Sequence, residues 1–456
     1  MDMREMRGMT RLLVLSSFSW LPACDGGGLV GYRSHAAGDA APTDTSTDPY
    51  PEVVRLTPEG CDHEVTFPGI FAPEDGALTY GPSPEPAGIH LSFPGSGDAS
   101  TTIAFSWRTD LETMASSVEL GTDADALDRV ETGWTLLAYQ GTAYDDNLIE
   151  RRLHEVQVCG LTPATTYHYR VGGEGGWSDV HSFRTAPAAG AATPIRFAVV
   201  GDSRTHYDTT WAEVAQAIDA YDPAFVVHSG DAVDYGYRIE EWDMHFDNGA
   251  DLFPGAPFLH VNGNHEDNAL VYYAEVALAG NEQWYDVRYG NLHFVGLNDW
   301  PTSSPTIEGA QRDFLEEILC GTDANWTFAM HHRPPYSSAP FHGPNPDLQD
   351  AWVPIFDSCG LDIDIAGHDH VYERTLPMFE GTPVATPAEG TIYTISAGGG
   401  ASLYEAGSGQ PWTHVTESVN SFVIVDVDGD TLRWRAYRIE DGVESLLDPM
   451  TLEKDR

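Results

Sequence analysis

Hydrophobic patterning divides most of the chain into two regions with different textures. Between residues 61 and 187, short runs such as 103–107 and 154–158 alternate apolar and polar positions, and turns rich in Gly, Pro and Asp separate them. Alternation with a period of two over short runs predicts half-buried β-strands. The region 61–187 is therefore predicted to be a β-sandwich, with Trp107 and Tyr167 in its core.

The region 194–440 instead alternates apolar strands with helical patterns. Trp211, Val214, Ala215 and Ile218 fall on one face of a predicted helix. Strands that alternate with helices predict an α/β layer, and a hairpin over 422–438 is expected to close it. The other predicted strands are 194–200, 224–228, 258–261, 291–298, 326–330, 361–365 and 392–396, and further helices are expected near 308–319 and 347–357.

The two ends of the chain are predicted to lie outside these regions. Residues 1–24 join several arginines to an apolar run that is too short for the ~20 residues of a membrane span, which predicts an export signal. The signal ends in Leu21 to Cys24, which resembles a bacterial lipobox. We therefore expect an exported lipoprotein at the cell envelope, in the periplasm or at the surface, with an ordinary secretory signal as the alternative. Residues 25–60 are expected to form a flexible linker and 441–456 a C-terminal tail.

Cysteine usage fits export. Besides Cys24 the chain has four cysteines, an even number that suits disulfides in an oxidising compartment. Three connectivities are possible, and the division into two regions makes Cys61–Cys159 and Cys320–Cys359 the natural pairs. No Cys-x-x-Cys motif is present, so a structural zinc or redox site is not expected.

The charge balance limits the partners. A formal net charge of −47, from 70 acidic and 23 basic residues, argues against binding nucleic acid or an anionic surface. An anionic substrate would be repelled at long range. Its attraction would need strong local positive charge, such as bound metal ions.

Possible metal ligands follow five of the predicted strands. Functional groups of α/β sheets gather beyond the carboxyl ends of the strands, where these residues stand. One Gly-Asp pair is common turn chemistry, but an ordered array of carboxylates, an amide and imidazoles suits Zn, Fe or Mn better than Ca or Mg. The five strand ends are Gly201-Asp202, Gly230-Asp231, Gly263-Asn264-His265-Glu266, His331-His332 and Gly367-His368-Asp369-His370.

These motifs, with Arg-Pro-Pro-Tyr directly after His332, resemble the calcineurin-like metallophosphoesterases. In the preceding sandwich, segments 160–172 and 183–185 resemble a fibronectin type III domain, so the chain is similar to the purple acid phosphatase branch. The resemblance covers roughly residues 85–440. It implies a fibronectin type III-like β-sandwich followed by an α/β metallophosphoesterase domain, a layered α/β/β/α sandwich.

The resemblance also implies a centre of two divalent or trivalent metal ions, Fe, Zn or Mn. A shared carboxylate and a bridging hydroxide hold such ions ~3.5–4 Å apart. The family's ligand stands two residues before the first proline, which selects His332 and places His331 on the opposite face of the strand end. The implied ligands are Asp202, Asp231 and His370 for one ion and Asp231, Asn264, His332 and His368 for the other.

Catalytic roles follow from the same resemblance. His265 and His342 are expected to steady the phosphate or protonate the leaving oxygen, with a plain loop histidine as the alternative for His342. Asp234 matches the carboxylate that orients the histidine of the Asn-His pair.

Two positions depart from the family pattern. Purple acid phosphatases have a tyrosine ligand where this chain has Asp234, and the neighbouring Tyr235 is expected to point elsewhere. Other branches have a histidine ligand where this chain has Arg204, which cannot ligate a metal. Arg204 is expected either to clamp a phosphate oxygen or to pair with nearby carboxylates, and water or His206 to complete the first ion's shell.

The sequence thus predicts an exported, acid phosphatase-like enzyme that cleaves small-molecule phosphate esters with a metal-bound hydroxide. A phosphodiesterase acting on nucleotides or glycerophosphodiesters is one alternative. The other is a lipid-anchored binding protein with a degenerate metal site.

Overall fold

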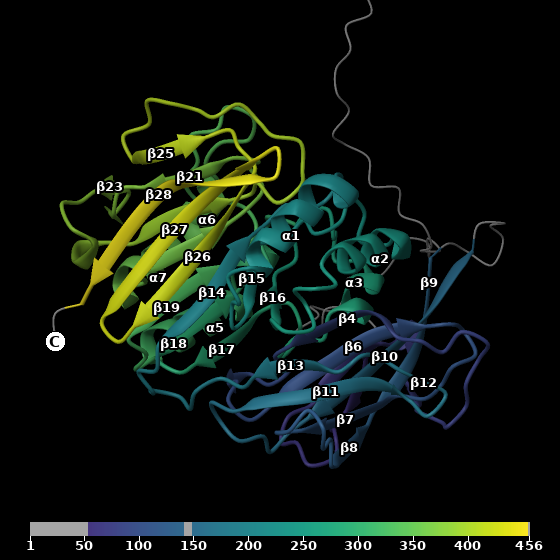
Figure 1. Cartoon of the computed structure of the whole chain (residues 1–456). Helices are drawn as coiled ribbons and strands as arrows, with labels where there is room; N and C mark the ends of the chain where they lie inside the picture. The colour runs from purple at the N-terminus through teal and green to yellow at the C-terminus, as the bar shows by residue number, and fades with distance from the viewer. Residues whose placement is uncertain (1–52, 141–147, 455–456) are drawn as a thin grey trace, which may run out of the picture. The chain divides into compact units, whose positions relative to one another are not determined.

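The computed structural model describes residues 53–140 and 148–454 (Figure 1). The expected signal peptide 1–24 and residues 25–52 of the expected linker lie outside these ranges. Within them, no helix is both long and apolar enough to cross a membrane.

The N-terminal region is the predicted β-sandwich. Trp107 is buried in its core, and the Tyr167 hydroxyl accepts a hydrogen bond from the Thr162 amide at 3.0 Å, which fixes the corner of a fibronectin type III-like fold. One sheet has the order β3 (Glu74–Asp75), β9 (Trp134–Gln140), β10 (Ile149–Val158), β6 (Ile103–Thr109) and β4 (Ala87–Ser92). The other has the order β12 (Gly176–Trp177), β11 (Thr166–Gly173), β7 (Ser117–Gly121) and β8 (Arg129–Thr132), with β13 (His181–Arg184) also paired to β11.

The second region has two facing sheets, as the layered α/β/β/α fold requires. Aromatic rings join them, because Phe197 contacts Phe294 and Phe328 at centroid distances of 5.3 and 5.5 Å. The first sheet has the order β16 (Phe258–His260), β15 (Val226–His228), β14 (Ile195–Val200), β26 (Ser421–Asp428), β27 (Thr431–Glu440) and β28 (Val443–Glu453). The second has the order β25 (Thr413–Glu417), β21 (Tyr372–Thr375), β24 (Ile392–Ser396), β20 (Ile363–Ala366), β19 (Trp326–Met330), β18 (Leu292–Gly296), β17 (Tyr285–Tyr289) and β5 (Gly97–Asp98).

Helices flank these sheets. The predicted apolar face of Trp211, Val214 and Ile218 is buried around α1, which contacts β26. The helix expected near 347–357 is two short helices, because Pro354 follows a break at Trp352. The helices are α1 (Ala212–Asp219), α2 (Ile239–Asn248), α3 (Leu270–Glu275), α4 (Ser304–Ile307), α5 (Ala310–Gly321), α6 (Pro346–Ala351) and α7 (Val353–Cys359).

The structure corrects two expectations about irregular segments. The expected C-terminal tail contains β28, the edge strand beside β27 at the yellow end of Figure 1. Its buried Asp448, Met450 and Leu452 alternate with outward residues, and Pro449 is tolerated because the strand lies at an edge. The end of the expected linker is also ordered, because β1 (Val53–Leu56) pairs with β2 (Val65–Pro68).

The sandwich and the α/β layers share one hydrophobic core and form one compact unit. The ring of His90 on β4 stacks on Phe246 of α2 with centroids 3.8 Å apart. Beside this stack, Arg108 and Arg151 from the sandwich both pair with Asp243 of α2, at 2.8 and 2.7 Å. The boundary expected between the two regions is therefore a packed, charged interface.

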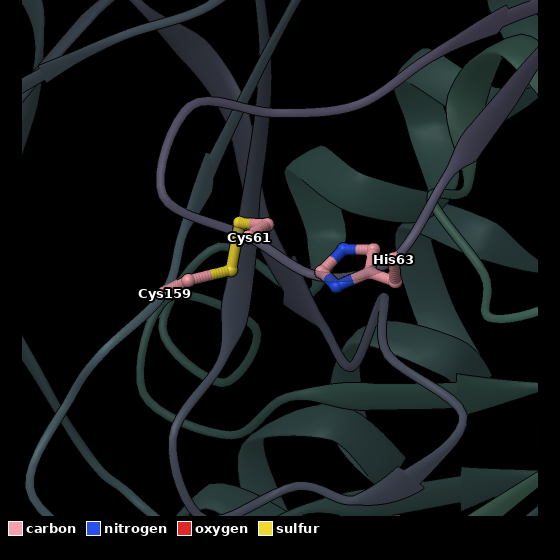
Figure 2. A group of neighbouring side chains, drawn as sticks. All are labelled: Cys61, His63 and Cys159. Atoms are coloured by element: carbon pink, nitrogen blue, oxygen red, sulfur yellow. A yellow bond between two sulfur atoms is a disulfide. The ribbon is translucent and has the colours of Figure 1, made fainter.

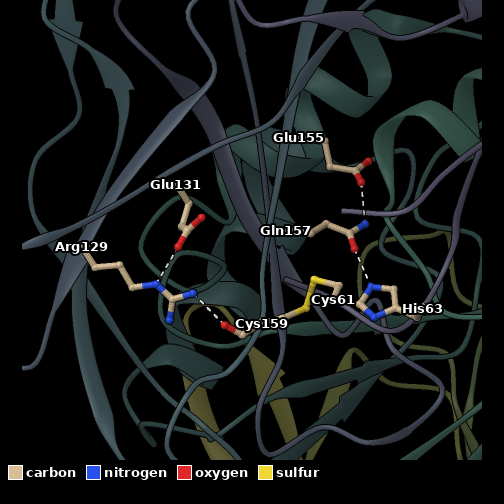
Figure 3. Close-up of a disulfide and its surroundings, with 7 residues drawn as sticks. All are labelled: Cys61, His63, Arg129, Glu131, Glu155, Gln157 and Cys159. Carbon is tan, nitrogen blue, oxygen red and sulfur yellow. Dashed lines mark hydrogen bonds and ion pairs between the residues drawn. A yellow bond between two sulfur atoms is a disulfide. The ribbon is translucent and has the colours of Figure 1, made fainter. Parts of the chain in front are cut away.

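Both expected disulfides are confirmed. Cys61 bonds to Cys159, at the end of β10, across a sequence separation of 98 residues (Figure 3). Cys320 of α5 bonds to Cys359 of α7 across 39 residues. Each bond stays within one of the two regions, as the sequence division implies.

Candidate metal centre

The strand ends singled out in the sequence converge in space. Strands β14, β15 and β16 run parallel in one sheet, and β19 and β20 run parallel in the facing sheet. Parallel strands carry their carboxyl ends to one edge, and the loops that follow both sets of strands meet there. The meeting residues are Asp202, Asp231, Asn264, His332, His368 and His370, which we call the metal centre.

Three side chains form the first half of the metal centre. Asp202, Asp231 and His370 each offer a ligand atom, and these atoms lie within 4.8 Å of one another. All three residues are buried, and His370 Nε2 lies 3.4 Å from Asp202 Oδ1. The two buried carboxylates need a compensating cation, which a metal ion would supply.

The second half lies around His332. Its Nε2 atom is 3.3 Å from Asp231 Oδ2 and 3.2 Å from Asn264 Oδ1. His368 Nδ1 lies 3.3 Å from the same nitrogen. Asp231 thus contacts both halves, as a bridging carboxylate must, and the mixed oxygen and nitrogen donors fit the ions implied by the sequence. The structure brings all six residues together, and their role as metal ligands stays a prediction.

Backbone carbonyls set the tautomers of two of these histidines. His332 Nδ1 lies 2.8 Å from the Ser229 carbonyl oxygen, and His370 Nδ1 lies 2.7 Å from the Ser402 carbonyl oxygen. A ring nitrogen that faces a carbonyl must carry a proton, so Nε2 of each ring is the atom directed into the centre and the one that would bind a metal ion once it is deprotonated. Sequence motifs gave no signal for these carbonyl partners.

The loops of the metal centre have a strained backbone. Asp202 and Asp231 both have φ 55°, and His368 has φ 71°, in the left-handed region. Such residues cost roughly 1–3 kcal/mol each and gather at functional sites. Glycine also allows close packing at Gly263 and Gly367, where a Cβ atom would lie 2.2 Å from Asp231 Oδ1 and 2.5 Å from Asp202 Oδ2, respectively.

Two further carboxylates position these loops, and sequence reasoning gave them no role. Glu266 accepts hydrogen bonds from the amides of Asp231, Ala232 and Gly263 at 2.7–2.9 Å. Burial and the charge of Asp231 raise the pKa of Glu266 to about 7. Asp299 accepts from the amide of His332 at 3.1 Å. The glutamate of the Gly-Asn-His-Glu motif was the available signal for Glu266.

His331 points away from the metal centre, as its place in the strand predicts. Its Nε2 atom lies 2.8 Å from Asp364 Oδ1 in the buried interior. Burial alone would lower the pKa of His331, but Asp364 and Asp299 together raise it to about 9. His331 is therefore a buried cation of the interior, while His332 faces the centre.

Arg204 lies inside the centre, paired with carboxylates. Its Nη1 donates to Asp234 Oδ1 at 2.9 Å, and its Nε lies 3.4 Å from Asp231 Oδ2. Its Nη2 donates to His370 Nε2 at 3.2 Å. Burial alone would raise the pKa of Asp231, yet His332, His265 and Arg204 hold it well below its usual value.

The expected role of Asp234 is corrected. His265 Nδ1 lies 2.8 Å from the backbone carbonyl oxygen of Asp234, so a carbonyl orients this ring. The Asp234 carboxylate instead accepts hydrogen bonds from Arg204 Nη1 and Thr205 Oγ1, at 2.9 and 2.7 Å. His265 itself faces the centre, with Nε2 3.9 Å from Asp231 Oδ2.

Neither suggested substitute ligand belongs to the first cluster. His206 is exposed, and its Nδ1 lies 2.7 Å from the Gly400 carbonyl oxygen. The Tyr235 ring is 46% exposed and lies under the Arg238 guanidinium, 4.0 Å from it, so the tyrosine points away as its register implies.

Aromatic rings cover the histidines of the centre. His342 stacks on His368 with centroids 4.1 Å apart, which brings this predicted histidine to the centre. Burial lowers the pKa of His342 to about 4, and the nearby His370 and Arg333 act in the same direction. Tyr404, which sequence reasoning missed, stacks on His370 at 4.0 Å. No local motif marks Tyr404, because its partner lies on another loop.

A second possible ligand cluster is structural. Cys61, His63 and Cys159 lie together, but the two sulfur atoms are joined and offer no thiolate (Figure 2). His63 Nε2 lies 2.7 Å from Gln157 Oε1, and the Gln157 amide donates to Glu155 (Figure 3). This chain of hydrogen bonds satisfies the polar groups beside the disulfide.

Comparisons with known proteins agree with both regions. The family model of the purple acid phosphatase N-terminal domain matches residues 86–185, and that of the calcineurin-like phosphoesterases matches residues 195–372. The chain is 27% identical over 378 residues to purple acid phosphatase 15 of Arabidopsis thaliana, covering 69% of this chain and 68% of the plant protein. It is 26% identical over 341 residues to acid phosphatase type 7 of Homo sapiens, covering 65% and 72%. The structure of a purple acid phosphatase from yellow lupin seeds has the same fold, with a TM-score of 0.67, 21% identity and coverage of 81% and 75%.

Proposed function

Because this chain is a metallophosphoesterase with a purple acid phosphatase N-terminal domain, we propose that it hydrolyses small-molecule phosphate esters with two metal ions in the metal centre. The observation that carries the proposal is the position of Asp231, whose carboxylate contacts both halves of the centre. A shared carboxylate is what a two-metal clamp requires. The ions, of Fe, Zn or Mn, supply Lewis-acid charge to the phosphoryl oxygens and an activated water when bound.

The chain's own residues hold and orient the substrate. Arg204 provides a fixed positive charge beside the centre, suited to a phosphate oxygen. His265 and His342 lie at the centre's edge, where an imidazole can donate a proton to the leaving oxygen or bind the phosphate. Buried carbonyl partners keep His332 and His370 in one orientation, so that the site is preorganised.

Export and a lipid anchor are also part of the proposal. Their support is the apolar run and the Leu21 to Cys24 segment of the sequence, together with the two disulfides of the structure. Labelling of the full chain with a radioactive fatty acid in a bacterial host tests the anchor. Label that persists in Cys24→Ser would contradict it.

The central test combines metal analysis with phosphate release. Protein purified without added metal should contain about two equivalents of transition metal and release phosphate from 4-nitrophenyl phosphate. Chelation and Asp231→Asn should each abolish release. Asp247→Asn is the matched control, because Asp247 pairs with Arg108 at the sandwich interface. Full activity of metal-free protein would contradict the proposal, and less than one ion per chain with no turnover would favour a degenerate binding protein.

A further inference from the structure

Two series of ring contacts, three of them stacked and the His342–Phe341 contact edge-to-face, lead from the metal centre to one exposed side chain. One runs from His368 through His342 to Phe341, with centroid distances of 4.1 and 4.6 Å. The other runs from His370 through Tyr404 to Phe341, with distances of 4.0 and 4.5 Å. We call His342, Tyr404 and Phe341 the aromatic cluster.

The backbone holds this cluster in place. Phe341 and His342 lie in the loop between β19 and α6, and Tyr404 lies in the loop between β24 and β25. The Tyr404 amide donates to the His370 carbonyl at 3.0 Å, which ties the second loop to the centre. The same two loops also line a cavity of about 490 Å³, through residues such as Ser337, Ser338 and Glu405.

Phe341 leaves much of its ring open to solvent beside the metal centre. Its side chain is 58% exposed, although its ring already touches Tyr404 and His342. A large apolar ring left in water beside a reaction centre offers a stacking surface for a ligand. The charge of the chain also limits the substrate. A net charge of −47 disfavours substrates with several anionic groups.

On the proposed phosphoesterase function, we infer that the aromatic cluster selects phosphate monoesters with a planar aromatic leaving group. The phosphate would lie on the metal centre, and the aromatic group would pack against Phe341 and Tyr404 at its edge. Phe341 is then a specificity-determining residue, and the favoured substrates are aryl phosphates with a single phosphate group.

The test separates recognition of the ring from leaving-group chemistry. Phenylphosphonate and methylphosphonate have no ester bond, so their inhibition constants report binding alone. The metal-loaded wild type should bind phenylphosphonate about 10-fold more tightly than methylphosphonate, and Phe341→Ala should reduce this preference about 3- to 10-fold, the size of an aromatic contact. Phe379→Ala, at another exposed phenylalanine in the β22 (Met378–Phe379) hairpin, should keep the preference.

The outcomes separate this inference from the proposed function. Equal inhibition by the two phosphonates, or an unchanged preference in Phe341→Ala, with normal phosphate release would overturn the aromatic selection and leave the phosphoesterase intact. A wild type that releases no phosphate from any ester would remove the function and the inference together. Melting curves of both variants check that the fold is retained.

Discussion

Arg204 and Asp234 form a salt bridge inside the metal centre, with 2.9 Å between Nη1 and Oδ1. These are the two positions at which the sequence departs from the family pattern of ligands. The departures compensate each other, because the guanidinium balances the carboxylate that stands in the tyrosine's place. They act as one structural unit, in which the Asp234 carboxylate holds the Arg204 guanidinium beside Asp231.

Arg204→Ala should lower kcat/KM for aryl phosphates about 10- to 100-fold, the range expected for a hydrogen bond to a charged group. The double variant Arg204→Ala with Asp234→Ala should lose less than the sum of the single losses, because the two residues bind each other. Arg238→Ala is the control, since Arg238 pairs with Glu241 away from the centre. Activity of Arg204→Ala within twofold of wild type would contradict the role of Arg204 in binding the phosphate group.

His265 is oriented by the carbonyl of Asp234, so removing the Asp234 side chain should leave the ring in place. His265→Ala should reduce kcat about 100-fold or more, as expected when a general acid is lost. Asp234→Ala should reduce it by no more than about 10-fold. Equal losses in steady-state kinetics would show that the carboxylate orients His265 after all.

Gly367→Ala should displace Asp202, because the added Cβ would lie 2.5 Å from its Oδ2 atom. Elemental analysis should then find about one ion per chain in place of two, with an unchanged circular dichroism spectrum. Gly321→Ala is the matched control, since nothing lies within 4 Å of its added Cβ. A full metal complement in Gly367→Ala would show that the loop can adjust.

Glu275 should make the protein less stable at high pH. Burial and the charge of Asp243 raise its pKa to about 8, although Arg108 and Arg151 act in the opposite direction. The folded chain therefore keeps a proton that the unfolded chain loses above its ordinary pKa of 4.5, and stability falls as the pH rises from 4.5 to 8.

Glu275→Gln removes this ionisation and keeps the side-chain shape. Its free energy of unfolding relative to wild type should rise by about 2–4 kcal/mol between pH 5 and pH 9, measured by thermal unfolding of both proteins at each pH. Other titrating groups, such as Glu155, occur in both proteins and cancel in the comparison. A stability difference between Glu275→Gln and wild type that does not change with pH would contradict the raised pKa of Glu275.

The two disulfides should differ modestly in how much each contributes to the free energy of unfolding. Chain entropy predicts a loss of about 4.7 kcal/mol when Cys61–Cys159 is removed and about 3.9 kcal/mol for Cys320–Cys359, because they close loops of 98 and 39 residues. Urea unfolding of the paired Cys→Ser variants measures both. A larger loss for the shorter loop would indicate that native packing, and not loop length, sets the contribution.

The sequence by itself determined most of the central strands of the second region, the order of the motifs and, through the family resemblance, the six residues that meet in the metal centre. Periodicity marks a strand, and parallel strands bring their carboxyl ends to one edge, so local patterns placed these residues at strand ends, and the family resemblance grouped Asp202, Asp231 and His370 around one ion. Trp107 and the Tyr167 corner followed from the sandwich pattern in the same way.

Only the tertiary structure decided which side chains pair across loops. The Arg204–Asp234 salt bridge, the Asp234 carbonyl behind His265 and the stack of Tyr404 on His370 join segments 30 or more residues apart in sequence. The polar edge strand β28 likewise exists because β27 offers it a partner. Such contacts depend on the relative placement of whole loops and strands, which no local pattern of hydrophobic and polar residues encodes.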